Sequence, residues 1–559
     1  MDVFITTYNE PLELVMKTAL AARDMTYPHK TWILDDGNRP EFRMAAESVG
    51  VGYVIRGQEW DGRPRFAKAG NVNNALSRTD GEFIAILDAD QMPEPHFLDR
   101  VLGYFDDPDI AFVQTPQKFW NVGKGDPLGS EAELFYGPIQ QGKDGWDAAF
   151  FCGSNAVLRR EALMALGLSR YARAAAGRTR QALRSGRGRL EDLRSEAGMR
   201  EPAQVPLLEA ALASMSNAED LLRHGGVLTE VTYALRQDFQ AIVHGAPEEA
   251  LSLIPEFDAI VETVDVSRTD QAIAIHPLDT TTITEDMATA MHLHAMGWGS
   301  VYHHEVLVHG LAPEDAKTML SQRQRWAAGS MQVFFKDNPL FVPGLSISQR
   351  LMYLGTMTSY LNGFAAVAYI LAPVIFLLFG VFPLEANATT FFLLFLPFFF
   401  SCQLLFQVSA NGARGMVRGQ QMSFALFPTW IQATLAGAAS AFWGKHLTFS
   451  VTAKNRRQRD TAYQYVWPQL VAMGLLVVAA IVGIGRAATG VAPLWPTLIS
   501  LVWVVIDLAL LSVVIGIARY SGPGPVQEPV LYSASELTVT LRQVESHLPT
   551  RSLRIPATT

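Results

Sequence analysis

The sequence predicts an α/β domain with a mostly parallel sheet, a helical insertion and an α-helical transmembrane region. Short apolar runs alternate with helical patterns over residues 1–166, and the same alternation returns over 276–340. Residues 167–275 between them are rich in Arg, Ala and Leu and are typical of helix. Long apolar runs with few charges dominate 341–520, and 521–559 are expected to form a C-terminal cytoplasmic tail.

Five apolar, β-prone runs are the expected strands of the first stretch. They are Val3–Thr6, Trp32–Leu34, Tyr53–Ile55, Phe83–Leu87 and Ala111–Gln114. Helical patterns at 11–24, 40–49 and 68–78 lie between them, as in parallel sheets that are covered by helices. Such sheets bind ligands at the carboxyl ends of their strands, which is where polar residues gather in this sequence.

The insertion begins with the Arg- and Ala-rich stretch Ser169 to Arg200 and continues as acidic helix. Its charge run is interpreted as a solvated helix face rather than a binding site. The α/β pattern resumes near Ile273. The later run Val301–Val308 alternates like a strand, and the histidines in and beside it lack the spacing of a zinc site.

Four apolar segments are each long enough to cross about 30 Å of hydrocarbon. They are approximately 353–382, 389–410, 466–486 and 494–518. A further stretch, 423–444, is apolar but carries Trp430 and Gln432, so it is expected to lie at the membrane interface. Basic residues gather in the loops after the second and before the third span. The positive-inside rule therefore predicts a multi-pass inner-membrane protein with its α/β domain in the cytoplasm.

Composition excludes several classes of protein. The 559 residues are too many for one compact core, and a net charge of −9 gives no support for nucleic-acid binding. The mean hydropathy of +0.13 is high for a soluble protein. The distant Cys152 and Cys402 exclude a disulfide framework and suit a reducing compartment. No secretory signal peptide is visible, because Met1 leads directly into a strand-like run.

Two carboxylates one residue apart follow an apolar strand in Ile86-Leu-Asp88-Ala-Asp90. This spacing points both acids beyond the end of the strand toward one ligand. A hard divalent cation such as Mg²⁺ or Mn²⁺ prefers oxygen ligands and often shares them with substrate phosphates. Asp88 and Asp90 are therefore candidate metal ligands, although an isolated Asp-x-Asp also occurs as a turn cap.

Other polar groups follow the neighbouring strands. Asp35 and Asp36 end the second strand, Thr7-Tyr8-Asn9-Glu10 follows the first, and Lys68 precedes the strand that ends at Asp88. Carboxyl ends of parallel strands share one edge of a sheet. Together these groups suit a nucleoside diphosphate, whereas Lys68 alone would be interpreted as an exposed, solvated lysine.

Thr284-Glu285-Asp286 precedes a helical pattern. Thr284 could cap that helix, which would place both acids in a first turn where the helix dipole stabilises them. Alternatively, Asp286, next to Glu285, is a general base that removes a proton from an acceptor hydroxyl. A single displacement with inversion needs one such base and no covalent nucleophile.

The last motif is Gln322-Arg323-Gln324-Arg325-Trp326. Arg325 can donate two hydrogen bonds to phosphate oxygens, and Trp326 offers a flat apolar face for a sugar ring. An amphipathic helix at the membrane surface, with a snorkelling Arg and an interfacial Trp, explains the same residues equally well when the motif stands alone.

These motifs, in this order, resemble the signature of the processive family 2 glycosyltransferases. Three further stretches resemble the bacterial cellulose synthase catalytic subunit. They are Phe150-Phe-Cys-Gly-Ser-Asn-Ala-Val-Leu-Arg-Arg, Leu311-Ala-Pro-Glu-Asp and Phe449-Ser-Val-Thr452-Ala-Lys454. The resemblance covers 1–165 and about 276–520. It implies a GT-A-type, Rossmann-like glycosyltransferase domain followed by transmembrane helices.

The resemblance also implies roles for individual residues. The nucleotide-sugar site would comprise Thr7, Tyr8, Glu10, Asp35, Asp36, Lys68, Asp88, Asp90, Gln322 and Arg325, with the metal on Asp88 and Asp90. The acceptor site would comprise Phe151, Cys152, Gly153 and Trp326, and a gating loop would comprise Phe449, Val451, Thr452 and Lys454. Asp286 would be the catalytic base.

The implied reaction transfers glucose from UDP-glucose to a growing β-1,4-glucan, with Mg²⁺ or Mn²⁺ as cofactor. The implied partners are the lipid bilayer and accessory polysaccharide-secretion subunits. Another β-linked polysaccharide or a glycolipid made from a different UDP-sugar is the alternative product, and a non-catalytic scaffold is a further alternative. The chain departs from the family pattern in three ways: it begins at the first strand without preceding membrane helices, it contains the insertion, and it has too short a tail for a cyclic-di-GMP-binding PilZ domain.

Overall fold

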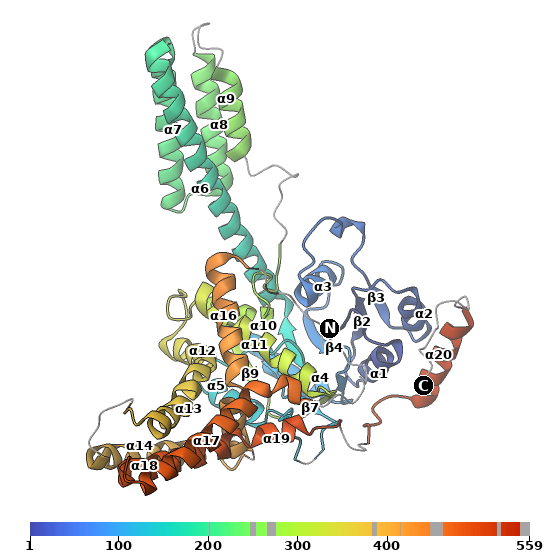
Figure 1. Ribbon diagram of the computed structural model, residues 1–559. Helices are drawn as coiled ribbons and strands as arrows, with labels where there is room; N and C mark the ends of the chain where they lie inside the picture. The colour runs from blue at the N-terminus through green and yellow to red at the C-terminus, as the bar shows by residue number, and fades with distance from the viewer. Residues whose placement is uncertain are drawn as a thin grey trace. The chain divides into compact units, whose positions relative to one another are not determined.

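The computed structural model describes residues 1–123, 125–200, 202–245, 253–264, 275–382, 388–413, 415–445, 447, 462–522 and 527–547. The chain forms two compact units (Figure 1). Met1–Leu163 and Leu278–Thr559 make up the first, called here the main unit, and Met164–Pro277 make up the second, called the insertion.

A mixed sheet forms the core of the main unit. Among the described residues, seven strands have the order β3-β2-β1-β4-β8-β6-β9. Their bounds are β1 Asp2–Thr7, β2 Lys30–Asp35, β3 Gly52–Val54, β4 Phe83–Asp88, β6 Ile110–Gln114, β8 Ala156–Arg159 and β9 Gly299–Tyr302. β8 runs antiparallel to β4 and β6, and the other pairs are parallel. The predicted mostly parallel sheet and its five strands are confirmed.

A second, smaller sheet has the order β5-β10-β7, formed by Met92–Pro93, Val308–Gly310 and Lys118–Phe119. The expectation of one strand over 301–308 is wrong. The chain leaves the first sheet after the His303 N–H, which donates to the Gln114 carbonyl at 2.9 Å. It joins the second sheet near Leu307, whose carbonyl accepts the Glu94 N–H at 2.8 Å. A half-buried turn between two strands therefore produces the alternation of apolar and polar residues.

Helices pack on the main sheet through apolar faces. Their bounds are α1 Leu12–Arg23, α2 Pro40–Ser48, α3 Ala67–Leu76, α4 Phe97–Val101, α5 Gln140–Asp144, α10 Glu285–Ala295 and α11 Ala316–Lys336. Short 3₁₀ turns lie at Gln58–Trp60 and Leu102–Asp106, and a π-helical turn lies at Phe135–Ile139. Val15 of α1 and Phe42 of α2 join Val3 and Ile5 of β1 in one buried cluster. This packing fixes the loops at the carboxyl edge of the sheet.

The C-terminal helix α20 (Ala534–His547) is part of the main unit's core rather than a loose tail (Figure 1). Leu537 and Val544 are buried in the cluster formed by α1 and α2. Glu536 also forms an ion pair with Arg23 of α1, with Oε2 2.9 Å from Nη2. Residues beyond the last apolar helix thus stabilise the sheet domain.

Within the described part of the chain, four helical stretches are long and apolar enough to cross a membrane. They are Ile347–Phe379, Phe392–Ser409, Trp467–Ala488 and Leu494–Ala518. Their helices are α12 Ile347–Thr358, α13 Asn362–Phe379, α14 Ala388–Ser409, α17 Trp467–Ala488, α18 Leu494–Leu511 and α19 Val513–Ala518, with 3₁₀ turns at Ser359–Leu361 and Ala462–Tyr465. All four lie close to the predicted spans, and the chain is membrane-embedded.

The stretch 423–444, expected at the interface, contains the end of α15 (Met416–Ala425) and α16 (Phe427–Trp443). α16 packs along α11 through Ala433, Ala327 and Ala328. Gly437 permits this approach, because a Cβ there would lie 2.8 Å from Cβ of Met331. A helix of the apolar region thereby holds the helix that carries the Gln-x-x-Arg-Trp motif.

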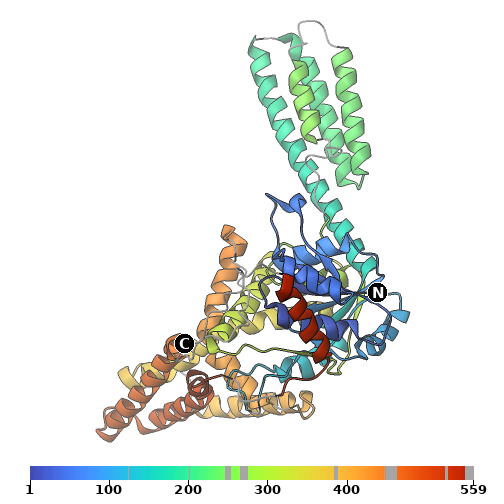
Figure 2. The same cartoon turned by 90° about the vertical axis from the view of Figure 1, so that its right-hand side faces the viewer.

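The insertion contains α6 (Arg160–Arg200), which begins in the main unit, followed by α7 Val205–Arg223, α8 Leu228–His244 and α9 Ile254–Val264, with a 3₁₀ turn at Pro202–Gln204. Figure 2 shows these helices side by side. Leu183, Leu208, Met215, Phe239 and Phe257 form their shared buried core. The insertion therefore has a hydrophobic core of its own.

Candidate active site

Strand register brings the predicted polar groups to one edge of the main sheet. Thr7 at the end of β1 pairs with Asp35 at the end of β2, and Thr6 pairs with Asp88 at the end of β4. These strand ends open into a cavity of about 1720 Å³ in the main unit. Of the predicted residues, Thr7, Tyr8, Glu10, Asp36, Lys68, Asp88, Asp90, Cys152, Gly153, Glu285, Asp286, Gln322, Arg325 and Trp326 line it.

The loop after β1 is organised by Glu10. Its Oε2 accepts hydrogen bonds from the Thr7 hydroxyl and the Tyr8 N–H, both at 2.8 Å. Tyr8 itself is half-exposed at the cavity. The carboxylate of Glu10 thus fixes a loop that presents an aromatic ring and a hydroxyl to a ligand.

Asp35 and Asp36 have different environments. Asp35 is fully buried and does not line the cavity. Its carboxylate is bound inside the protein: it accepts hydrogen bonds from the Gly37 N–H at 2.9 Å, from the Tyr53 hydroxyl at 2.8 Å and from the Arg39 guanidinium. Asp36 lines the cavity and is paired with Arg56. Burial raises the pKa of the Asp36 carboxyl, and the Arg56 guanidinium opposes this shift. The structure brings only Asp36 of the two to the site.

The Asp88 side chain is 39% exposed, whereas Asp90 is buried. Asp88 is ion-paired with Lys68, whose Nζ also donates to the Gly153 carbonyl at 2.6 Å. Asp90 is buried and accepts the Leu311 N–H at 3.1 Å. Among the described residues, no three His, Cys, Asp or Glu side chains gather into a metal site. Two carboxylates on one cavity wall fit a hard cation that takes its remaining oxygens from phosphate and water.

Glu285 and Asp286 occupy the first turn of α10 deep in the cavity wall. Burial raises the pKa of both carboxyls, while the nearby Lys68 and Arg325 lower it. Thr284 occupies the N-cap position and both acids lie in the first turn, as the capping interpretation predicted, but the Thr284 side chain makes no capping hydrogen bond. The helix start therefore places two partly buried acid groups at the cavity wall, near Lys68 and Arg325.

Asp286 lies against the segment that precedes β8. Gly153 has a φ of +86°, and a Cβ there would lie 3.0 Å from the Asp286 Oδ2. A glycine is therefore required for this approach. Cys152 beside it is partly buried, desolvation raises the pKa of its thiol, and the Gln140 amide donates to its sulfur at 3.1 Å. Phe151 is buried away from the cavity, whereas Phe150 lines it.

The motif on α11 lines the cavity with Gln322, Arg323, Arg325 and Trp326, and Trp326 is 42% exposed. Arg325 lies near Asp88, Glu285 and Asp286, and burial lowers the pKa of its guanidinium. The guanidinium of Arg323 is bound to the protein backbone, because it donates to the Leu128 and Gly129 carbonyls at 2.8 and 2.7 Å. Arg325 thus provides a cation near the acids, and Trp326 provides an open ring.

The expected gating loop, Phe449 to Lys454, lies outside the described residues. Arg56 and Asn71 are among the cavity residues that were not predicted from the sequence. Arg56 lines the cavity two residues after β3, so its place at a strand end was an available signal. Asn71 of α3 also lines the cavity and donates to the Leu34 carbonyl at 2.8 Å.

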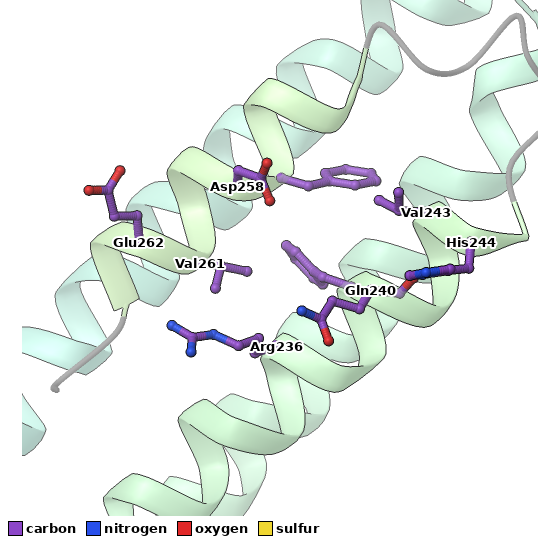
Figure 3. Close-up of a pocket in the computed structure, with 9 residues that line it drawn as sticks. Arg236, Gln240, Val243, His244, Asp258, Val261 and Glu262 are labelled. Carbon is purple, nitrogen blue, oxygen red and sulfur yellow. The ribbon is translucent and has the colours of Figure 1, made fainter.

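A smaller hollow of about 340 Å³ lies between α8 and α9 of the insertion (Figure 3). Its floor is formed by Phe239 and Phe257, which are buried core residues. Arg236, Asp258 and Glu262 form its charged rim. The hollow is a groove between packed helices and contains no grouping of acid, base and nucleophile among the residues described.

Two protein families match the chain. Residues 2–167 match Glycosyl transferase family 2, and residues 249–517 match Cellulose synthase. The sequence is 28% identical to "Putative cellulose synthase 2" of Komagataeibacter xylinus over 542 residues, which is 93% of this chain and 28% of that protein. It is 32% identical to "Cellulose synthase catalytic subunit [UDP-forming]" of Pseudomonas fluorescens (strain SBW25) over 399 residues, which is 69% of this chain and 39% of that protein.

The chain therefore spans well under half the length of these two relatives. Among solved structures, a mannosyltransferase from Pyrobaculum calidifontis in complex with GDP-Man and Mn²⁺ aligns with a TM-score of 0.40 and 14% identity, covering 80% of this chain and 87% of that one. A score this low adds nothing to the two family matches.

Proposed function

The chain belongs to the family 2 glycosyltransferases and contains a cellulose synthase region, and on this premise we propose that it is an inverting, processive transferase. It transfers glucose from UDP-glucose to the non-reducing end of a growing β-1,4-glucan and moves the polymer across the membrane. The active site faces the cytoplasm at the inner membrane, as the basic loops favour. Another β-linked polysaccharide or a glycolipid is the alternative product.

One observation carries the proposal: a partly buried carboxylate of the cavity wall lies against a glycine, with two cationic side chains near it. Asp286 Oδ2 lies against Gly153, and Lys68 and Arg325 stand near it. A base in this position takes the proton of the acceptor hydroxyl. The hydroxyl oxygen then bonds to the anomeric carbon as the bond from that carbon to the pyrophosphate oxygen breaks, and UDP leaves with the electron pair.

Binding of the donor uses both sides of the cavity. Thr7, Tyr8 and Asp36 hold the nucleoside, while Lys68 and Arg325 contact the pyrophosphate. Asp88 and Asp90 would hold Mg²⁺ or Mn²⁺, which supplies positive charge against the departing diphosphate. Glu285 adds negative charge beside Asp286. Trp326 stacks on the terminal sugar of the acceptor, because its exposed ring is the apolar face at that wall.

The test is a donor panel. Purified protein in nanodiscs is incubated with Mg²⁺ or Mn²⁺ and a series of UDP-sugars, and released UDP and polymer are measured. We expect UDP release from UDP-glucose, a cellulase-sensitive product, and a loss of roughly 10²- to 10⁴-fold in Asp286→Asn. Turnover of a different donor sugar with the same loss in Asp286→Asn overturns the substrate and keeps the mechanism. Equal rates in Asp286→Asn and the parent protein overturn the assignment of the base.

A further inference from the structure

We propose that Arg56 is a positioning residue for the donor nucleotide: it clamps Asp36 to the strained turn that aims Lys68 into the cavity. The inference rests on the proposed function, because it names a determinant of donor affinity at the same site. Arg56 follows β3 and is buried, with 1% of its side chain exposed. A guanidinium in the interior needs a partner for each of its donors, which makes its contacts informative.

The first contact of the clamp is a two-point ion pair. Arg56 Nε donates to Asp36 Oδ1 at 2.6 Å, and Nη2 donates to Asp36 Oδ2. The planar fork of arginine fits the two oxygens of a carboxylate side by side. Asp36 therefore keeps one orientation at the cavity wall.

The second contact holds a strained turn. Phe66 and Ala67 have φ values of +53° and +40°, although neither is glycine. Left-handed backbone at two consecutive residues with side chains is costly and persists where surrounding contacts enforce it. Arg56 Nη1 donates to the Arg65 carbonyl, and Nη2 lies 3.5 Å from the Ala67 carbonyl oxygen. The same guanidinium thus holds both sides of the turn.

The turn leads directly into the helix that carries Lys68. α3 begins at Ala67, and a Cβ on Gly70 would collide with the Arg65 carbonyl oxygen and lie 2.7 Å from Arg56 Nη1. This close packing leaves the first turn of α3 little freedom relative to Arg56. The position of Lys68, which pairs with Asp88, consequently depends on Arg56.

An aromatic ring completes the clamp. The Arg56 guanidinium lies 5.0 Å from the centre of the Trp60 ring, and the Trp60 indole N–H donates to Asn74 of α3 at 3.1 Å. The loop between β3 and α3 is therefore fixed at Asp36, at the turn and at the helix. Lysine cannot replace this arrangement, because one ammonium group cannot hold a carboxylate and two carbonyls in a plane.

The decisive variant is Arg56→Lys, with Arg63→Lys as the matched control. Arg63 lies in the same loop, is exposed and does not line the cavity. Binding of UDP is measured by equilibrium titration, and KM and kcat are measured from UDP release. We expect KM and the Kd of UDP to rise about tenfold in Arg56→Lys, as for loss of one charge-assisted hydrogen bond, with kcat within about threefold. Arg63→Lys should match the parent protein.

Hydrogen exchange at residues 66–71 gives a readout that does not depend on activity. We expect faster exchange there in Arg56→Lys than in Arg63→Lys. Unchanged KM and unchanged exchange overturn the clamp, and so does a fall in kcat at constant KM.

If Arg56→Lys does not fold, Trp60→Leu tests the same clamp. We expect KM to rise about threefold in Trp60→Leu, and an unchanged KM would overturn the clamp. Failure of the parent protein to bind UDP contradicts the proposed function instead, and the exchange result then decides the clamp alone.

Discussion

The main unit and the insertion place their charged side chains in opposite ways. In the main unit, Asp36 and Arg56 have side chains only 8% and 1% exposed, and Asp286, which lines the cavity, is partly buried. In the insertion, the side chains of Arg187 and Glu191 are 44% and 49% exposed, and those of Arg223 and Asp220 are 65% and 61% exposed. These ion pairs of the insertion are surface pairs one helical turn apart.

If the proposed function holds, this difference separates charges that take part in the reaction from charges that keep a helix surface soluble. A buried charge loses its hydration and persists only with partners or for function. Exposed pairs on a helix contribute only about 0.3–0.5 kcal/mol each. The insertion is therefore stabilised by its apolar core, while the cavity of the main unit holds its acids and cations at an energetic cost. Substitutions in the cavity should therefore affect activity, whereas substitutions in the core of the insertion should affect stability.

The largest expected effect is at the carboxylate edge of the cavity. Asp88→Asn removes a charge that faces the pyrophosphate, and we expect UDP release to fall roughly a hundredfold or more, since such electrostatic contributions amount to several kcal/mol. The control is Asp192→Asn, an exposed acid on α6 of the insertion, which should leave the rate unchanged. Chelation of divalent cations should stop the parent enzyme as well. Full activity in Asp88→Asn would show that the Asp88 carboxylate takes no part in the reaction.

The second effect concerns the core of the insertion. Leu208→Ala opens a cavity among buried residues and should destabilise the insertion by about 2–5 kcal/mol. Hydrogen exchange in α7 of the full-length protein measures this loss, and Leu221→Ala, at an exposed position of the same helix, is its control. UDP release should persist, because the insertion has its own core. A loss of turnover as large as that of Asp88→Asn would contradict the separation of roles.

The smallest effect is a displacement of the pH profile. A general base works deprotonated, and burial raises the pKa of Asp286, so kcat/KM should fall with decreasing pH at values above the usual carboxyl range. Lys68 lowers that pKa, so Lys68→Gln should move the acid limb to still higher pH, besides weakening donor binding. Rate measurements across pH test this. A limb that stays in place, or moves toward acid, would contradict the electrostatic link between Lys68 and Asp286.

Sequence patterns predicted the sheet strands well because buried parallel strands leave continuous apolar runs. β1 is buried at all six positions, and the acids that end β2 and β4 directly follow such runs, which suffices to predict that they share one edge of the sheet. The alternation of apolar and polar residues over 301–308 led to the wrong prediction of a strand, because a turn with half-buried residues gives the same pattern. The antiparallel β8 carries no local sign of its direction, which depends on its neighbours.

The motifs by themselves determined the chemical class that we propose for the site, and the apolar runs determined the four spans found among the described residues, since both follow from residue types and their spacing along one segment. Only the tertiary structure decided which of two adjacent acids faces the cavity: Asp35 is bound by Arg39 and Tyr53, while Asp36 is bound by Arg56 from the loop after β3. It also decided that α20 belongs to the core of the sheet domain. These choices depend on contacts between separate helices, strands and loops, which local sequence patterns do not encode.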